Sequence, residues 1–472
     1  MAKKPSAKLT PVHIFGYGCG DAGGVVGLYM VSGFMTRFLQ VNLEVNAALL
    51  ATILLIWNIW DAVNDPLMGT IMDICFAKAK PGADKFRPWI LASIPVLAIG
   101  MISFFTVPAM LDGFAMIAAA FILKIVFEAG YTMMNIGMGS LIGNMATNDS
   151  ERAVLASARG FGSTLGGAVG GMLIPLCLGK FGMGNDGYAK TAIIMAIPMV
   201  ILVFLHYALT EERTKGAAVE KTAEEKEAEK FKITDIWNII TKNRAFLALV
   251  LHSICICGVQ ALAQGATTYM YADVLKNISI QSLGSAMSTA TMVIILVSAP
   301  IMTKKWDLVL IIRTCLLAGV VAYVGLLAYA LMVSEMIPVL FVIWNSLAGA
   351  LVQMSVQMQW GLVAESIDYN EYLTGKRNEG TIYGFFSLSR RIGSTIANSL
   401  TVILIAAIGF NAEIPLAGGD QAIETINGIK LMVCGFPALA ALGSFCCFTF
   451  IWCINADVRA KMAEWKAAKA AK

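Results

Sequence analysis

The chain has 472 residues, of which 58% are hydrophobic and only 14% are charged, and its mean hydropathy is +0.72. Soluble proteins carry roughly 25% charged residues, so the composition excludes an ordinary soluble domain. It predicts an all-α polytopic membrane protein, because apolar runs long enough to cross a bilayer recur along the chain. The net charge of +4 is small and spread among loops, so no nucleic-acid partner is expected.

Apolar runs predict about twelve spans, six on each side of one polar break. They lie at roughly 14–39, 45–74, 88–108, 113–144, 153–178 and 188–210, and then at 245–272, 280–303, 308–333, 337–366, 381–410 and 428–454. We therefore expect an N-terminal six-helix bundle at 1–210, a charged cytoplasmic connector at 211–244, a C-terminal six-helix bundle at 245–454 and a cytoplasmic tail at 455–472.

Basic residues predict the orientation. They concentrate in alternate short loops and before the first span, which favours cytoplasmic placement of both termini. An even number of spans requires both termini to lie on the same side of the membrane, in agreement with this placement. The tail reads equally well as an amphipathic helix on the membrane surface or as an ordinary solubilising segment.

Two carboxylates interrupt the second predicted span. Asp61 and Asp65 are four residues apart, so a helix places them on one face. An ionised carboxylate at mid-membrane costs about 2.5–3.5 kcal/mol even on lenient scales. A cation-binding role is therefore favoured over the alternative, a polar face for helix packing.

A weak internal repeat relates the two halves. Residues 157–165 (SARGFGSTL) and 389–396 (SRRIGSTI) both place a basic residue just before a Gly-Ser-Thr entry into the fifth helix of their half. Parallel repeats of this kind are typical of transporters that bind substrate near the membrane midplane, between the halves.

Several motifs together resemble one known family. The stretches 17–21 (YGCGD), 59–69 (IWDAVNDPLMG), 84–89 (DKFRPW) and 365–380 (ESIDYNEYLTGKRNEG), a loop between the tenth and eleventh spans, are similar to those of the glycoside–pentoside–hexuronide:cation symporters of the major facilitator superfamily. The resemblance implies inward transport of a sugar or glycoside with Na⁺, H⁺ or Li⁺. It also implies a bacterial cytoplasmic membrane location.

The same resemblance implies a cation site. Asp61 and Asp65 match the family's cation-binding carboxylates, and Thr132 matches a threonine associated with Na⁺ coordination. Oxygen ligands suit Na⁺, whereas a proton needs only the carboxylates. The choice between Na⁺ and H⁺ therefore stays open.

At the positions that contact sugar in this family, the chain differs from the best-known member. Two sugar-contacting acids become Val25 and Asn135, and a tryptophan becomes Gly139, while the basic residues Arg159 and Arg391 are kept. The substrate should therefore differ from a galactoside, and an acidic sugar such as a hexuronide is one hypothesis.

Polar and aromatic residues inside the spans are the candidate substrate ligands. Amides and guanidinium groups suit sugar hydroxyls, and aromatic faces suit the apolar side of a sugar ring. The alternatives are hydrogen bonds between helices for the glutamines and a salt bridge closing the cytoplasmic side for the arginines. The candidates are Arg159, Arg391, Asn135, Gln353, Gln357, Trp360, Gln260 and Gln264.

Charged residues in two loops are candidates for gating, because members of the superfamily close their cytoplasmic side with comparable loops. They are Asp73, Lys85, Arg87, Asp368, Glu371 and Arg377.

We expect a secondary active symporter that acts as a monomer in the lipid bilayer and has no cofactor besides the transported Na⁺ or H⁺. The alternatives are a sodium-coupled lysolipid carrier, which would need a wide apolar lateral cleft, and a non-transporting sugar sensor on the same scaffold. An enzyme is not expected, because no nucleophile–base set stands out on any span.

Overall fold

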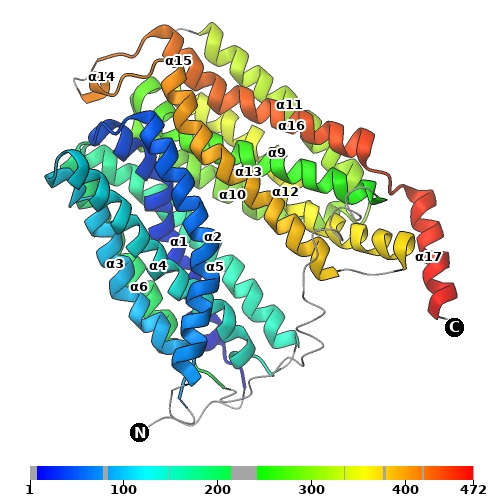
Figure 1. Ribbon diagram of the computed structural model, residues 1–472. Helices are drawn as coiled ribbons and strands as arrows, with labels where there is room; N and C mark the ends of the chain where they lie inside the picture. The colour runs from blue at the N-terminus through cyan, green and yellow to red at the C-terminus, as the bar shows by residue number, and fades with distance from the viewer. Residues whose placement is uncertain are drawn as a thin grey trace. The chain divides into compact units, whose positions relative to one another are not determined.

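The computed structural model describes residues 8–77, 83–147, 149–213, 242–333, 335–375, 379–416 and 419–470. Every regular element in these ranges is a helix (Figure 1). The first half of the chain forms α1 (Pro11–Arg37), α2 (Ala47–Ala77), α3 (Arg87–Phe104), α4 (Gly113–Met145), α5 (Asp149–Phe181) and α6 (Asn185–Leu209). This confirms the all-α class predicted from composition.

The second half of the chain repeats the pattern of long helices. It forms α9 (Arg244–Tyr269), α10 (Gln281–Met302), α11 (Leu308–Met332), α12 (Pro338–Thr374), α13 (Glu379–Ala407), α14 (Glu413–Leu416), α15 (Ile423–Lys430), α16 (Phe436–Cys446) and α17 (Ala456–Ala470). Wider π-helical turns extend several of them: η1 (Phe38–Asn42), η3 (Met270–Val274), η5 (Leu431–Gly435) and η6 (Cys447–Ile451). The short 3₁₀ turns are η2 (Pro108–Met110) and η4 (Ile278–Ile280).

The described helices include 10 that are long and apolar enough to cross a membrane. Two further long helices, α2 and α13, occupy the second and eleventh predicted spans, and α2 contains the shorter apolar stretches Ala47–Asp61 and Leu67–Phe76. The chain is therefore a multi-pass membrane protein.

One predicted boundary is wrong. The sequence reading places a loop at 365–380, whereas α12 runs on to Thr374. Gly375 ends the helix with a left-handed φ of +72°, and its N–H donates to the Glu371 carbonyl. A glycine at this position stops a helix, because other residues adopt the left-handed conformation only with strain. Asp368 and Glu371 are therefore helical residues.

The described chain divides into two compact units. The first comprises residues 1–219 with two short segments, 271–286 and 409–422, and the second comprises 220–270, 287–408 and 423–472. The two predicted bundles supply most of each unit. Most of the predicted connector, residues 214–241, lies outside the described residues, so the domain boundaries stay a prediction.

In the first unit, α1 packs against both α5 and α6, and α3 packs against α4 and α6. Glycines let α1 and α5 approach closely. A Cβ on Gly162 would lie 2.0 Å from the Gly18 carbonyl oxygen, and one on Gly166 would lie 2.3 Å from the Ala22 carbonyl oxygen. Small residues spaced four apart are the usual solution for close helix packing in membranes. This packing fixes the polar residues of α1 and α5 relative to each other.

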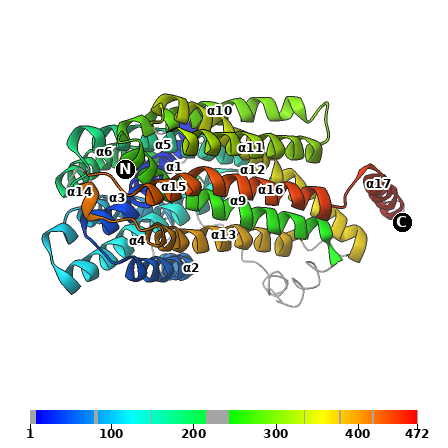
Figure 2. The same cartoon turned by 90° about the horizontal axis from the view of Figure 1, so that it is seen from above.

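In the second unit, α9 packs against α13 and α16, and α11 packs against α12 and α16. Figure 2 shows α9, α13 and α16 running side by side. The tail helix α17 contacts α12. Arg459 of α17 forms ion pairs with Asp307 and Glu365, and Lys466 lies 2.8 Å from Asp368.

Candidate functional site

The predicted cation site lies where α2 meets α4. Asp61 is half-buried on α2. Asn64, on the same helix, is 4% exposed and donates from its amide nitrogen to the Thr132 hydroxyl of α4 at 2.8 Å. Asn64 of the 59–69 motif is therefore joined across the helices to the predicted cation ligand Thr132. The side chain of Asp65 lies outside the described part of the structure, so its place among the ligands stays a prediction.

A buried ion pair lies beside this site, and the sequence reading did not single it out. Lys124 and Glu128 pair on α4 and are 5% and 7% exposed. The Lys124 ammonium also lies 5.7 Å from the centre of the Trp57 ring and interacts electrostatically with Asp61. The signal was present in the sequence, because opposite charges four residues apart interrupt an apolar span.

A second polar cluster joins α1, α4 and α5. The Arg159 guanidinium donates to the Asn135 side-chain oxygen at 2.6 Å, and its Nε lies 3.4 Å from a carboxylate oxygen of Asp21. A Cβ on Gly139 would lie 3.4 Å from Arg159, so the glycine leaves room for the guanidinium. The structure thus brings together two predicted substrate residues, Arg159 and Asn135. It adds Asp21, which the sequence reading noted only as part of a motif.

The exposure of this cluster suits a ligand site. The Asp21 side chain is 10% exposed and that of Arg159 is 33% exposed. Beside them, the Tyr17 hydroxyl donates to the Met138 carbonyl at 2.7 Å and is thereby fixed. A partly exposed guanidinium flanked by a carboxylate and an amide offers both donors and acceptors, which is what polyhydroxylated molecules require.

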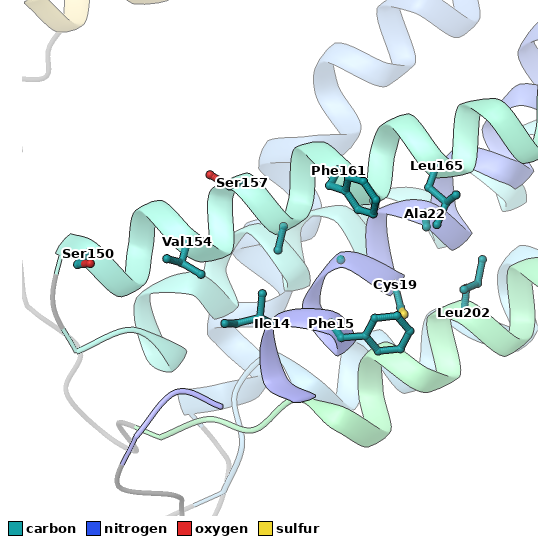
Figure 3. Close-up of a pocket in the computed structure, with 13 residues that line it drawn as sticks. Ile14, Phe15, Cys19, Ala22, Ser150, Val154, Ser157, Phe161, Leu165 and Leu202 are labelled. Carbon is teal, nitrogen blue, oxygen red and sulfur yellow. The ribbon is translucent and has the colours of Figure 1, made fainter. Parts of the chain in front are cut away.

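A separate cavity of about 620 Å³ lies among α1, α5 and α6 (Figure 3). Phe15, Cys19 and Leu202 point into it from α1 and α6, and among the described residues that line it the polar side chains are Cys19, Ser150 and Ser157. Neither Asp21 nor Arg159 lines this cavity. Its apolar walls do not suit a sugar, which needs several polar partners.

In the second unit, two of the four predicted glutamines pair with each other. The Gln260 amide nitrogen of α9 donates to the Gln353 side-chain oxygen of α12 at 2.8 Å. Hydrogen bonding between helices is the alternative to substrate binding that the sequence leaves open for these glutamines. Gln357 donates to the sulfur of Met292 at 3.5 Å, and Gln264 is exposed.

Trp360 is 39% exposed and has aromatic and cationic neighbours on α13. Its ring packs edge-on against Phe386, with centroids 5.2 Å apart, and the guanidinium of Arg390 lies 5.2 Å from the ring centre. The arginine predicted from the sequence, Arg391, is exposed on the same helix. Arg390 is therefore the arginine that the structure places beside Trp360.

The predicted gating residues of the first half are bound within their own unit. Arg87 pairs with Asp84 at 2.7 Å and lies 4.7 Å from the Tyr207 ring centre, while the Lys85 ammonium lies over Phe76 and Phe86. The side chain of Asp73 lies outside the described residues.

Glu212 secures the end of the segment between α2 and α3, where α3 begins. Its carboxylate is 2% exposed and accepts hydrogen bonds from three successive backbone N–H groups, those of Lys85, Phe86 and Arg87. It thereby caps the first turn of α3, where backbone N–H groups have no helical partner.

Among the predicted gating residues of the second half, Asp368 pairs with Lys466 of α17 and Glu371 is half-buried on α12. Arg377 lies outside the described residues. In α17, the hydrogen bond that Arg459 donates to the Glu365 carboxylate is the main cause that raises the pKa of Arg459, with a further contribution from Asp307. The tail helix is therefore tied to the end of α12 that carries the predicted gate.

Comparison with known proteins gives a consistent result. Residues 16–454 match the family described as MFS/sugar transport protein. A glucuronide carrier protein homolog of Escherichia coli is 25% identical over 456 residues, which cover 93% of this chain and 91% of the relative. An isoprimeverose transporter of Lactiplantibacillus pentosus is 24% identical over 426 residues, which cover 88% and 83% of the two chains.

The crystal structure of a D-xylose–proton symporter has a TM-score of 0.60 at 14% identity, covering 93% of this chain and 97% of that one. This likeness shows the fold. The matches confirm the resemblance seen in the sequence motifs, and they confirm that the chain is of the transporter class and not an enzyme.

Proposed function

The chain belongs to the MFS/sugar transport protein family, and we propose that it is a symporter that carries a sugar, glycoside or hexuronide inward with Na⁺ or H⁺. Alternating access of two helical bundles around a central site is the mechanism that this architecture supports. The observation that carries the proposal is the Asn64–Thr132 hydrogen bond, which puts a hydroxyl of α4 beside the face of α2 that bears Asp61.

In this proposal the transported cation binds at Asp61, Asp65 and Thr132. Two ionised carboxylates on one helix face repel each other, and a bound cation relieves this repulsion. Cation and sugar then favour each other's binding by the same factor. Entry of one positive charge gains about 2.3 kcal/mol per 100 mV of membrane potential. That free energy supports accumulation on the order of fifty-fold.

The sugar binds, in our proposal, at the cluster of Asp21, Arg159 and Asn135. The carboxylate of Asp21 already balances the positive charge of Arg159, because its Oδ1 lies 3.4 Å from the Arg159 Nε. Hydroxyl groups can join this arrangement through the remaining donors and acceptors, whereas a substrate carboxylate must compete with Asp21. We therefore favour a neutral sugar or glycoside. The names of the glucuronide carrier homolog and the isoprimeverose transporter support testing both acidic and neutral glycosides.

Uptake into sealed right-side-out membrane vesicles tests the proposal. A panel of labelled glycosides, pentosides and uronides is offered with an imposed Na⁺ gradient or an imposed proton gradient, each with an ionophore control. We expect at least one solute to accumulate above equilibrium under one of the gradients. Binding without gradient-driven accumulation would instead indicate a sensor. Competition by a uronide against a neutral labelled glycoside decides whether an acid is accepted.

A lysolipid carrier is the second candidate, because the cavity among α1, α5 and α6 is apolar and large enough for an acyl chain. Adding a labelled lysophospholipid to the panel separates the two functions. Cation-driven lysolipid uptake without uptake of any sugar would replace the first proposal with this one.

A further inference from the structure

Two opposite charges are buried on the membrane helix α4, four residues apart. Lys124 and Glu128 are each more than nine-tenths buried and pair with one another. Helix stability does not account for the pair, because an acidic residue followed four positions later by a basic one is the favourable order, and here the order is reversed. A charge inside a membrane span costs several kcal/mol and usually has a functional reason.

The pair lies on the stripe of α4 that faces the proposed cation site. Lys124, Glu128 and Thr132 follow each other at intervals of four, so they share one helix face. On α2, Trp57 lies level with Lys124, through the contact of the ammonium with its ring, and Asn64 lies level with Thr132, through their hydrogen bond. Both intervals span about two helical turns.

Asp61 falls between these two levels. It follows Trp57 by four residues and precedes Asn64 by three, so it stands on α2 at the height of the Lys124–Glu128 pair on α4. The electrostatic interaction between Lys124 and Asp61 agrees with this placement. The Lys124 ammonium therefore pairs with Glu128 on its own helix and interacts electrostatically with the proposed cation ligand Asp61 on α2.

We propose that Lys124 is a tethered cation of the coupling site, which competes with the transported cation for Asp61, and that Glu128 holds it back. A lysine ammonium is a compact charge on a flexible stem, so it can move between neighbouring carboxylates. With Lys124 held on Glu128, the competition at Asp61 is weaker and the incoming ion binds there. The proposal rests on the proposed function, in that Asp61 must belong to the cation site.

The two partners then have opposite effects on cation affinity. Removing the ammonium removes the competitor, so Na⁺ binds more tightly. Removing the charge of Glu128 releases Lys124 to pair with Asp61, so Na⁺ binds more weakly. A pair with only a structural role predicts neither opposite signs nor any change when both charges are removed together.

Equilibrium binding of ²²Na⁺ to the purified full-length protein in nanodiscs tests this without knowledge of the sugar. We expect the Kd for Na⁺ to fall at least tenfold in Lys124→Gln and to rise at least tenfold in Glu128→Gln. The double variant Lys124→Gln/Glu128→Gln removes both charges of the pair together and should bind as tightly as Lys124→Gln. The matched control is Lys190→Gln/Asp186→Asn, which removes an exposed pair of the same charges four residues apart on α6 and should leave the Kd unchanged.

Each outcome decides the proposal. A double variant with the wild-type Kd, or single variants that shift the Kd in the same direction, overturns it. If the wild type binds no Na⁺ detectably, a gain of binding in the double variant supports the proposal, and absence of binding in both overturns it. The proposed function fails separately, in the vesicle assay, if no solute accumulates under any gradient.

Discussion

Replacing Asp273 with asparagine should destabilise the protein strongly. Arg37, at the end of α1, and Asp273, in the turn η3, belong to the same compact unit and form a two-point contact: Nη2 to Oδ1 at 2.7 Å and Nε to Oδ2 at 3.2 Å. Both side chains are only 4% exposed. The variant leaves the buried guanidinium without its counter-charge.

The magnitude follows from this burial. Breaking a buried ion pair by removing one partner costs about 3–5 kcal/mol, because the remaining charge stays out of water without compensation. Removing both charges, in Arg37→Met/Asp273→Asn, should recover much of the loss. The exposed pair Lys276–Asp420 in the same unit is the control, since its side chains are 61% and 65% exposed and Asp420→Asn should change the stability little.

Thermal unfolding of the purified protein in detergent, with a double-mutant cycle, measures the effect. We expect a large drop in the midpoint for Asp273→Asn, partial recovery in the double variant and nearly no shift for Asp420→Asn. Equal midpoints for Asp273→Asn and Asp420→Asn would refute the reasoning that burial makes the Arg37–Asp273 pair important.

Three further substitutions test other contacts. Gly162→Ala puts a Cβ 2.0 Å from the Gly18 carbonyl oxygen and should sharply reduce the yield of folded protein in size-exclusion chromatography, whereas Gly160→Ala, in open space, should not. Glu212→Ala removes the acceptor for the backbone N–H groups at the start of α3 and should cost about 2 kcal/mol in unfolding assays; an unchanged midpoint would contradict the cap. Arg459→Gln removes two ion pairs of α17 and should speed tryptic cleavage of the tail, unlike a Lys461→Gln control; equal cleavage rates would mean that these pairs do not dock the helix.

The helices were predictable from the sequence because apolar length is a local property. The end of α12 was not, since the polar residues of 365–380 read as a loop although they continue the helix to Thr374. Only the left-handed Gly375 stops it, and a single glycine is a weak signal within a polar stretch.

Asp61 and Asp65 could be proposed as a pair from the sequence because one helix carries the pattern, and their role stays a prediction. Partners from distant helices were not predictable, because a single sequence does not show which residues meet. The Asp21–Arg159 pair spans α1 and α5, and Gln260 reaches Gln353 across α9 and α12. Lys124 and Glu128 were visible as charges in a span. Their place beside α2 was not visible, because it depends on the contact of the Lys124 ammonium with the Trp57 ring.

The most direct test of the account is gradient-driven uptake by Asp61→Asn in sealed vesicles, using the solute that the wild type accumulates. The matched control is Asp186→Asn, which removes an exposed carboxylate of the same unit. We expect that Asp61→Asn abolishes accumulation against the gradient, while Asp186→Asn accumulates like the wild type. Uphill uptake by Asp61→Asn at the wild-type level would contradict the central claim that Asp61 couples the cation to transport.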